Sequence, residues 1–245
     1  MRKHKGASPS WLAAWLTAAT VLVLSGCSGG SLPSGGPGGG GQATLGEVGA
    51  LDLWQEVFSD SPPSVVDVRP ADQYDAFHIP GSVSKPNGVG LAGVLSAQGT
   101  SSLVIVGRTD EDARAVAEQL VRKGKSARVL VGGIENWTLG LDISAATLKA
   151  WLDGGRNVVL IDVRGAGEYA SGHINGSINR PLDEISEWAP NLDAQQEYVM
   201  ICGIGARSKR ARDTLARQYG LTRVHNLLGG VSAWPYGLVG CGCGG

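Results

Sequence analysis

The sequence predicts an α/β protein built from two similar units in tandem, each a small parallel β-sheet with helices on both faces. Short β-branched runs alternate with helical stretches, which is typical of a parallel sheet covered by helices. The second half of the chain also repeats the first, so both halves are expected to share one fold. A length of 245 residues leaves room for two domains of ordinary size.

The internal repeat consists of two pairs of matching blocks. DVRPADQYDAFHIPGS, which begins at Asp67, aligns with DVRGAGEYASGHINGS, which begins at Asp162. Further along, VGGIENW ending at Trp137 aligns with LGGVSAW ending at Trp234. The domains expected from this repeat are residues 44–141 and 142–238.

The elements of the second repeat follow from its pattern of apolar runs and breaks. Ala211, Leu215 and Tyr219 lie along one face of a helical period, which predicts an amphipathic helix before the last strand. In chain order, the expected elements are a helix from Ser144, a strand at 158–163, a short helix at 168–171, a strand at 198–202, a helix at 208–219 and a strand at 224–227.

The first 27 residues have the pattern of an export signal. MRKHK supplies a basic start, and Trp11–Leu24 is apolar but too short to span a membrane comfortably. The run ends in Leu-Ser-Gly-Cys at Cys27, which resembles the lipobox of bacterial lipoproteins. That resemblance implies cleavage before Cys27 and lipidation of its thiol; an ordinary signal peptide or an anchor helix is the alternative.

Residues 28–43 are rich in Gly and Ser, so they are expected to form a flexible tether. The mature protein is expected to be exported and anchored by acyl chains to the bacterial cell membrane, on its periplasmic or extracytoplasmic face. The outer membrane is the alternative location. The formal net charge of -1 and the pI near 6.4 give no electrostatic indication of a nucleic-acid partner.

Three cysteines remain once Cys27 is set aside: Cys202, Cys241 and Cys243. An odd number in an oxidising compartment favours a working thiol over a disulfide framework.

The segment CGIGARS, Cys202–Ser208, follows the apolar run at 198–201 and is the candidate site. It is either a tight turn of small residues or a nucleophile held in a ring of backbone N–H groups. The second interpretation suits a thiolate, because the carboxyl end of a parallel strand and the start of the next helix both favour an anion. The candidate substrate-binding residues of the loop are Gly203, Ile204, Gly205, Ala206, Arg207 and Ser208.

Gly203 and Gly205 are expected to adopt backbone angles that other residues resist, so that successive N–H groups point inwards. Arg207 is expected to face the loop or its entrance and to offer a planar fork to an oxyanion. The next basic residues, predicted to rim the site or else to form a solvated helix face, are Lys209, Arg210 and Arg212.

The order DVR-x4-Y-x3-HI-x-GS, then Cys-x2-Gly-x-Arg-Ser, then GG-x3-W resembles the rhodanese-like domains over residues 51–238. This resemblance implies a sulfurtransferase. Cys202 would attack the outer sulfur of a donor such as thiosulfate and then pass the sulfur from its persulfide to a thiol or to cyanide. The resemblance implies no metal and no organic cofactor.

Loop length separates two branches of this fold. Phosphatases of the same fold use Cys-x5-Arg, whereas Cys202 and Arg207 form the shorter Cys-x4-Arg. The chain therefore resembles the sulfurtransferases more than a phosphatase or an arsenate reductase. The opening Cys-Gly-x-Gly is also similar to mercaptopyruvate sulfurtransferases, so 3-mercaptopyruvate is the second candidate donor after thiosulfate or another sulfane donor.

The first repeat serves as a control for the second. Asp67 to Gly107 and Asp162 to Cys202 both span 40 residues, since 107 − 67 = 202 − 162 = 40. Gly107 therefore takes the place of the cysteine, and the first repeat is predicted to be catalytically inert.

Features present in both repeats need no catalytic explanation. His78 and His173 are expected to satisfy local backbone groups, with a general base as the alternative. The other shared residues are expected to form a hydrogen-bonding clamp or to cap the core; they are Asp162, Arg164, Trp137 and Trp234.

Cys241 and Cys243 lie in the tail of residues 239–245, past the last expected element. They could accept sulfur from Cys202, resolve it as a disulfide or bind a soft metal such as Cu(I); an incidental pair is the alternative. A non-enzymatic exported carrier of sulfur or a soft metal, which uses these thiols and Cys202, is the second functional hypothesis. The sequence predicts no particular protein partner.

Overall fold

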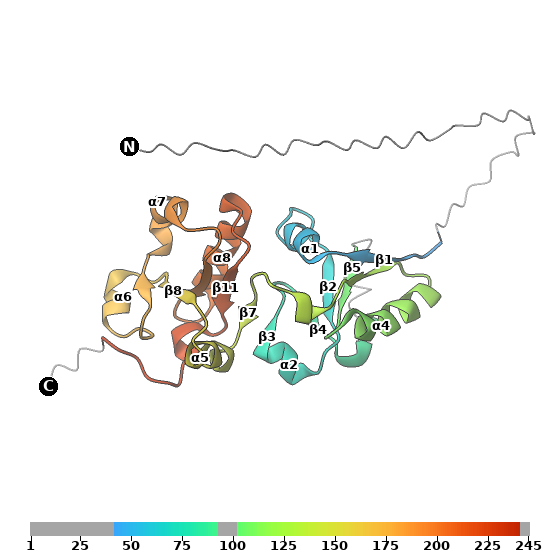
Figure 1. Ribbon diagram of the computed structural model, residues 1–245, viewed down its shortest axis with the longest axis horizontal. Helices are drawn as coiled ribbons and strands as arrows, with labels where there is room; N and C mark the ends of the chain where they lie inside the picture. Colours follow the sequence, from blue (N-terminus) through green and yellow to red (C-terminus); the bar gives the residue numbers. More distant parts are fainter. Residues whose placement is uncertain (1–41, 93–101, 241–245) are drawn as a thin grey trace, which may run out of the picture. The chain divides into compact units, whose positions relative to one another are not determined.

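The structure is a computed structural model that describes residues 42–92 and 102–240 (Figure 1). The predicted fold class is confirmed, since the described residues form two mainly parallel sheets with helices packed against them. Across these residues, no helix combines the length and the apolar character that crossing a membrane requires.

The first sheet is parallel throughout, with strand order β1-β6-β5-β2-β4. Its strands are β1 (Leu45–Val48), β2 (Ser64–Asp67), β4 (Val83–Ser84), β5 (Leu103–Val106) and β6 (Ala127–Leu130). The described helices of this repeat are α1 (Ala50–Val57), α2 (Ala71–Ala76) and α4 (Asp110–Arg122), with 3-10 turns at Pro86–Gly88 and Ile134–Asn136.

The second sheet has strand order β3-β7-β11-β10-β8-β9. Its strands are β3 (Phe77–His78), β7 (Asp142–Ile143), β8 (Val158–Asp162), β9 (Ile178–Asn179), β10 (Glu197–Ile201) and β11 (Val224–Leu227). Its helices are α5 (Ala145–Asp153), α6 (Ala166–Ala170), α7 (Ile185–Trp188) and α8 (Ala206–Tyr219), with 3-10 turns at Leu182–Glu184, Ala189–Asn191 and Gly230–Ala233.

The second sheet takes its edge strand from the first repeat. β3 pairs antiparallel with β7, and the other strand pairs of this sheet are parallel. The internal sequence repeat does not predict that a strand of the first repeat joins the second sheet. β3 follows α2 directly and is only two residues long, so it leaves no clear strand pattern in the sequence.

Two helices begin two residues earlier than the sequence pattern predicts. α8 begins at Ala206, two residues before the predicted start, because the left-handed turn at Gly205 ends the loop and Ala and Arg, both good helix formers, follow it directly. α6 begins at Ala166, whereas the sequence pattern predicts a start at residue 168. The predicted bounds of β11 are confirmed.

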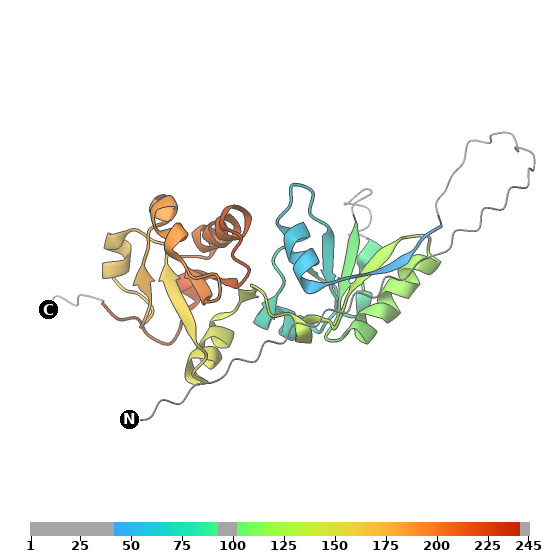
Figure 2. The same cartoon turned by 45° about the horizontal axis from the view of Figure 1, so that its top comes forward.

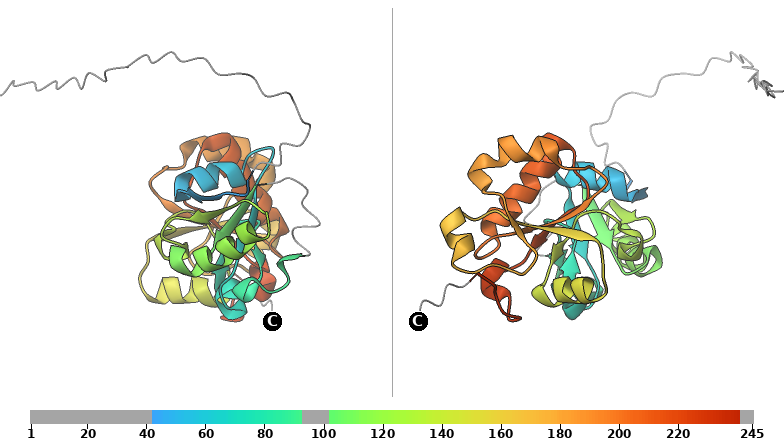
Figure 3. Two further views of the ribbon diagram at one scale, coloured as in Figure 1. Left: turned by 90° about the vertical axis from the view of Figure 1, so that its right-hand side faces the viewer. Right: turned by 60° about the vertical axis from the view of Figure 1, so that its left-hand side comes forward.

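The central strands are buried on both faces, and their side chains alternate between two cores. Val199 and Ile201 of β10 join a core that also contains side chains of the first repeat, such as Val104 and Leu53. Met200 and the residue after the strand, Cys202, point the other way, into the core beneath α8. α8 packs along β10 and β11, and α4 packs along β5 and β6 (Figures 2 and 3).

The segment that joins the repeats is seated on the second one. The Gly140 N–H donates to the Thr222 carbonyl at 2.8 Å, and a Cβ at Gly140 would lie 2.1 Å from the Val224 carbonyl oxygen. The indoles of Trp137 and Trp234 each donate to the carbonyl three residues later, at 3.1 Å. Trp137 is buried in the shared core, whereas Trp234 is only partly buried against it.

Candidate functional site

The candidate loop is the four-residue connection from β10 to α8. Cys202 follows the last residue of the strand and is 1% exposed. Its Sγ accepts a hydrogen bond from the Gly205 N–H at 3.1 Å and lies 3.3 Å from the Ser208 hydroxyl oxygen. Ser208 is fully buried in the first turn of α8, so the thiol faces both the loop and the start of the helix.

Only one of the two loop glycines adopts a left-handed backbone. Gly205 has φ +94°, and a Cβ there would lie 3.0 Å from the Gly229 nitrogen. Gly203 has no positive φ, so the prediction that both glycines need special backbone angles is wrong for Gly203. The turn at Gly205 alone is enough to bring its N–H onto Sγ.

The Gly-Gly pair of the second repeat closes on the back of this loop. Gly230 has φ +56°, and a Cβ there would lie 2.1 Å from the Cys202 carbonyl oxygen. The same oxygen accepts from the Val231 N–H at 2.7 Å, and the Gly203 carbonyl accepts from the Ser232 N–H at 3.0 Å. The GG-x3-W motif is therefore a steric and hydrogen-bonding support for the loop.

The surroundings of Cys202 favour its thiolate. Burial by itself raises the pKa of the thiol. Hydrogen bonds from the Ser208 hydroxyl and from the N–H groups of Ser208, Ile204 and Gly205 outweigh burial, so the pKa of the Cys202 thiol lies below its ordinary value. The N-terminal end of the 14-residue helix α8 also favours a negative charge at this place.

An ion pair stands at the mouth of the loop. The Arg207 guanidinium donates to both carboxylate oxygens of Glu168, at 2.7 and 2.6 Å, and both side chains are about half exposed. One of its terminal nitrogens lies 3.7 Å from where a Cβ of Gly203 would stand, which puts the guanidinium beside the loop entrance. The Arg207 hydrogen bonds lower the pKa of Glu168 to about 2, so this carboxylate is charged at neutral pH.

The predicted basic rim is wrong for one of its three members. Lys209 and Arg210 are exposed, and Lys209 bonds Asp213 at 2.8 Å. Arg212 is fully buried and donates to Asp142 at 3.1 Å and to Asp213 at 2.6 Å. Arg212 lies four residues after Ser208, so both occupy the inward face of α8, and its charge belongs to the interior.

The residues shared by both repeats form two similar clamps. Arg164 donates to both oxygens of Asp162 at 2.7–3.0 Å and to the Gly172 carbonyl at 2.7 Å. His173 Nδ1 lies 2.9 Å from the Tyr169 carbonyl oxygen, and the two rings stack. The first repeat contains both arrangements as well: Arg69 bonds Asp67, and His78 bonds and stacks on Tyr74. These residues hold the backbone in place and do not contact Cys202 through a hydrogen bond.

The corresponding loop of the first repeat is shorter and leads into an acidic helix start. Three residues separate β5 from α4, against four in the second repeat. A Cβ at Gly107 would lie 2.7 Å from the Thr109 carbonyl oxygen and 2.8 Å from the Ala113 nitrogen. The first turn of α4 carries three acidic residues, and Thr109 forms a capping box with Asp112. The space that Cys202 occupies in the second repeat is thus filled here.

The sequence pattern does not mark two buried polar residues that lie near the site. Asn226 of β11 accepts from Ser208, and Asp142 of β7 accepts from Asn226; both are buried. The signal available in the sequence was the pair of polar residues, His225 and Asn226, in the middle of the short strand β11.

The remaining predicted residues lie outside the described part of the chain. These are Cys27, Cys241 and Cys243. The chain is described as far as Gly240, and just before it the N–H and carbonyl of Val239 both bond the backbone of His173 at 2.9 Å.

A known protein family matches both repeats, and single known proteins match part of the chain. A family model described as the rhodanese-like domain matches residues 50–139 and 144–235. The "Putative sulfur carrier protein YrkF" of Bacillus subtilis (strain 168) is 33% identical over 93 residues, which are 38% of this chain and 50% of that protein. The "Putative sulfurtransferase YtwF" of the same organism is 38% identical over 93 residues, 38% of this chain and 88% of that protein. The chain thus matches only half the length of the first relative.

Among solved structures, the chain is similar to a rhodanese-related protein from Thermoplasma volcanium, with 32% sequence identity and a TM-score of 0.37. The match covers 40% of this chain and 97% of that protein's chain. The two matches to the family model together span most of the sequence, one in each repeat. The chain therefore belongs to the rhodanese-like domain family and contains two copies of the domain.

Proposed function

We propose that the protein is a sulfurtransferase that moves sulfane sulfur from a donor such as thiosulfate to a thiophilic acceptor through a persulfide on Cys202. The observation that carries this proposal is a buried cysteine whose Sγ faces the N–H of Gly205 and the first turn of α8 in one repeat only. Such a site favours a thiolate, which is the form of cysteine that attacks sulfur.

The reaction would proceed in two displacement steps. The Cys202 thiolate attacks the outer sulfur of thiosulfate, the S–S bond of thiosulfate breaks, and sulfite leaves with the electron pair. A thiol or cyanide then attacks the outer sulfur of the persulfide, which regenerates the Cys202 thiolate. The exposed fork of Arg207 can offer its charge to the sulfonate oxygens of the donor, provided that it exchanges part of its pairing with Glu168.

The test uses the chain from Gln42 onward, reduced and desalted, with thiosulfate and cyanide, and follows thiocyanate. We expect turnover that Cys202→Ala abolishes. Sulfite release is measured in parallel, because it reports the first step alone. Absence of both sulfite and thiocyanate would exclude thiosulfate as the donor, and 3-mercaptopyruvate would then be tried.

A non-enzymatic sulfur carrier is the second candidate, because the chain resembles YrkF, which is named as a sulfur carrier. A carrier would form one persulfide per Cys202 and release one sulfite, without continuous thiocyanate production. Mass spectrometry of the loaded protein, compared with the rate of thiocyanate formation, separates the two functions.

We also propose that Cys241 and Cys243 take part in sulfur relay, as acceptors of the Cys202 sulfur. The anchoring of Val239 at His173 supports this proposal, because His173 follows α6, whose Glu168 holds Arg207 at the loop mouth. Truncation after Gly240 should then leave thiocyanate formation with cyanide intact and remove sulfur transfer to the protein's own tail, as detected by mass spectrometry.

The lipobox at Cys27 supports a further part of this proposal: export and acyl anchoring of the protein at the bacterial membrane. Labelling cells with a palmitate analogue tests it, since the label should appear on the unaltered protein and not on Cys27→Ala.

A further inference from the structure

The Ser208 hydroxyl has one proton and three neighbours that can accept it. Its oxygen lies 2.7 Å from Asn226 Oδ1, 3.1 Å from the Gly205 carbonyl oxygen and 3.3 Å from Cys202 Sγ. A hydroxyl donates one hydrogen bond, so Asn226 and Cys202 compete for the same proton. Ser208 is fully buried and Asn226 is 3% exposed, so water offers neither side chain a ready substitute.

The orientation of the Asn226 amide is fixed by Asp142. A carboxylate only accepts hydrogen bonds, so the amide must turn its NH2 group to Asp142, where Nδ2 donates to Oδ1 at 2.8 Å. Asn226 Oδ1 is then left facing Ser208. The negative charge on Asp142 polarises the amide and makes Oδ1 a better acceptor.

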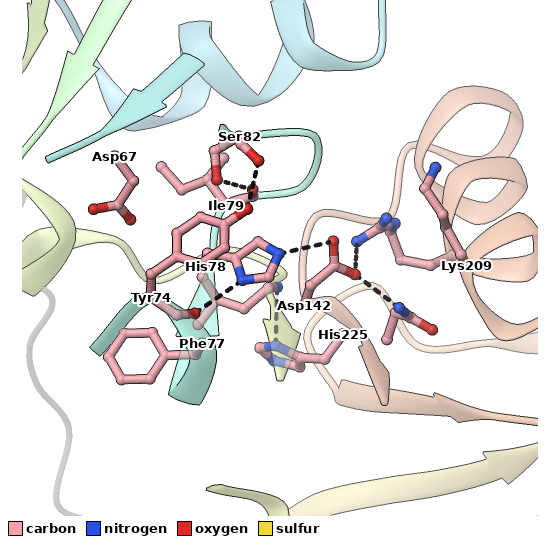
Figure 4. A network of polar contacts seen from close by, with 12 residues as sticks. Asp67, Tyr74, Phe77, His78, Ile79, Ser82, Asp142, Lys209 and His225 are labelled. Atoms are coloured by element: carbon pink, nitrogen blue, oxygen red, sulfur yellow. Dashed lines mark hydrogen bonds and ion pairs between the residues drawn. The ribbon is translucent and has the colours of Figure 1, made fainter. Parts of the chain in front are cut away.

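The first repeat contributes to the Asp142 end of this chain of contacts. Asp142 pairs with Asn226 of β11 on one side and with His78 of β3 on the other, so the three residues lie in one row of the sheet. The second carboxylate oxygen lies 3.8 Å from His78 Nε2, as Figure 4 shows with His78 and Asp142 facing each other. Arg212 donates to the first oxygen at 3.1 Å.

This row of polar residues is absent from the inert repeat. There the register pairs Glu47 of β1 with Val129 of β6, where the active repeat pairs Asp142 with Asn226. The Val129 side chain can neither accept nor donate a hydrogen bond. Glu47 is exposed, and its carboxylate bonds Arg114 at 2.6 Å. The chain of contacts therefore occurs only beside the cysteine.

We propose that Asp142 and Asn226 are positioning residues that hold the Ser208 proton away from Cys202 while Sγ is neutral and yield it when Sγ becomes a thiolate. In the neutral state, the thiol can donate to the Ser208 oxygen while that hydroxyl donates to Asn226. In the thiolate state the charge-assisted bond to Sγ is the stronger one, and Asn226 Oδ1 loses its donor.

A consequence for sulfur transfer rests on the proposed function. In a persulfide the negative charge lies on the outer sulfur, so Sγ is neutral and the Ser208 proton returns to Asn226. Asp142 and Asn226 therefore stabilise the persulfide form of the protein relative to the form with a Cys202 thiolate.

The charged groups around these atoms come from four elements. Arg207, Arg212 and Asp213 lie on α8, where Asp213 bonds Arg212, and Glu168 on α6 is paired with Arg207. Asp162, in its clamp with Arg164 after β8, and His78 on β3 complete the set. Asp142 reaches Cys202 only through Asn226 and Ser208, so its effect must pass through the Ser208 hydroxyl.

The test measures thiolate absorbance at 240 nm against pH in the chain from Gln42 onward, with the same chain carrying Cys202→Ala subtracted so that the other cysteines cancel. Asn226→Val, which introduces the residue of the inert repeat, should move the midpoint to lower pH and raise the thiolate fraction at pH 6 about five-fold. Ser208→Ala should move the midpoint to higher pH. The double variant should match Ser208→Ala, because Asn226 acts through Ser208.

His225→Gln is the control, since His225 precedes Asn226 on the same strand but bonds Glu197 and Leu141 instead. It should leave the midpoint unchanged. Asn226→Leu serves as a second variant of similar volume. A midpoint that rises or stays fixed in both Asn226 variants, or effects that add in the double variant, would overturn the proposal. None of these measurements requires sulfur transfer, so a failure of the sulfurtransferase proposal would leave their result valid.

Discussion

Gly230 shows most directly how single residues support the site. Its positive φ and the 2.1 Å approach of its missing Cβ to the Cys202 carbonyl exclude any side chain. Gly133 has φ +60° in the first repeat, and a Cβ there would lie 2.3 Å from the Arg108 carbonyl oxygen. Because both repeats share this constraint, the second glycine of each pair is needed for the fold of the turn and not for sulfur chemistry.

We expect Gly230→Ala to lower the free energy of unfolding by about 3 kcal/mol or more, because the turn must move away from the loop. The matched control is Gly176→Ala, at φ +80° with nothing within 4 Å of the added carbon, which should cost about 1 kcal/mol. Urea unfolding of both variants measures the difference. Equal losses would show that the close approach has no energetic weight.

The connection from strand to helix distinguishes the two repeats at the scale of elements. In the second repeat, four residues and a left-handed Gly205 bring the Gly205 N–H and the first turn of α8 onto the thiol of Cys202. In the first, three residues and a Thr109 capping box place three carboxylates at the helix start. Those carboxylates occupy the N-terminal end of α4, where an anionic donor would have to bind.

Gly107→Cys, introduced together with Cys202→Ala, should therefore produce no thiocyanate from thiosulfate and cyanide. The new Cβ would meet the Thr109 carbonyl and the Ala113 nitrogen within 2.8 Å, and no loop would hold the resulting thiolate. Circular dichroism checks that the doubly substituted chain is folded. Turnover in this variant would show that a cysteine alone, without the longer loop, is sufficient.

At the scale of the whole molecule, the repeats are joined by shared structure. One hydrophobic core contains side chains of both, and β3 of the first repeat completes the second sheet. His225 adds a polar contact, because its Nδ1 accepts from the Leu141 N–H of the joining segment at 3.1 Å and its Nε2 donates to Glu197 at 3.0 Å. This pattern requires a neutral ring with its proton on Nε2.

The His225 contact predicts a loss of stability below neutral pH. Burial lowers the pKa of His225 below its usual value near 6.5, although Glu197 opposes this effect. As pH falls through 6.5, the unfolded chain takes up a proton that the folded chain does not, so the stability present above that pH is lost. Burial raises the pKa of Glu197, but the hydrogen bonds from His225 and Arg156 outweigh it and hold this pKa at about 2, so Glu197 does not titrate in this range.

Urea unfolding at pH 7 and at pH 5 checks this prediction. The loss between them should be smaller in His225→Gln than in the unaltered chain, with a difference of at most about 1.4 kcal/mol per pH unit. Identical pH dependence in the two proteins would mean that His225 does not carry the effect.

The sequence by itself determined the tandem α/β fold, the position of Cys202 and the missing thiol at Gly107. These features depend on local patterns and on spacing, and the internal repeat compares them position by position. The helix start was misplaced by two residues, because the left-handed turn at Gly205 ends the loop earlier than the sequence pattern indicates.

Only the tertiary structure decided which side chains surround the thiol. Asp142 lies 84 residues from Asn226 and 70 from Arg212 in the sequence, and no local period relates them. Arg212 was assigned to the surface because charge usually favours water, whereas the packing of α8 on the sheet turns it inwards, where Asp142 and Asp213 balance its charge. Contacts of this kind depend on how distant elements pack, so neither composition nor spacing can reveal them.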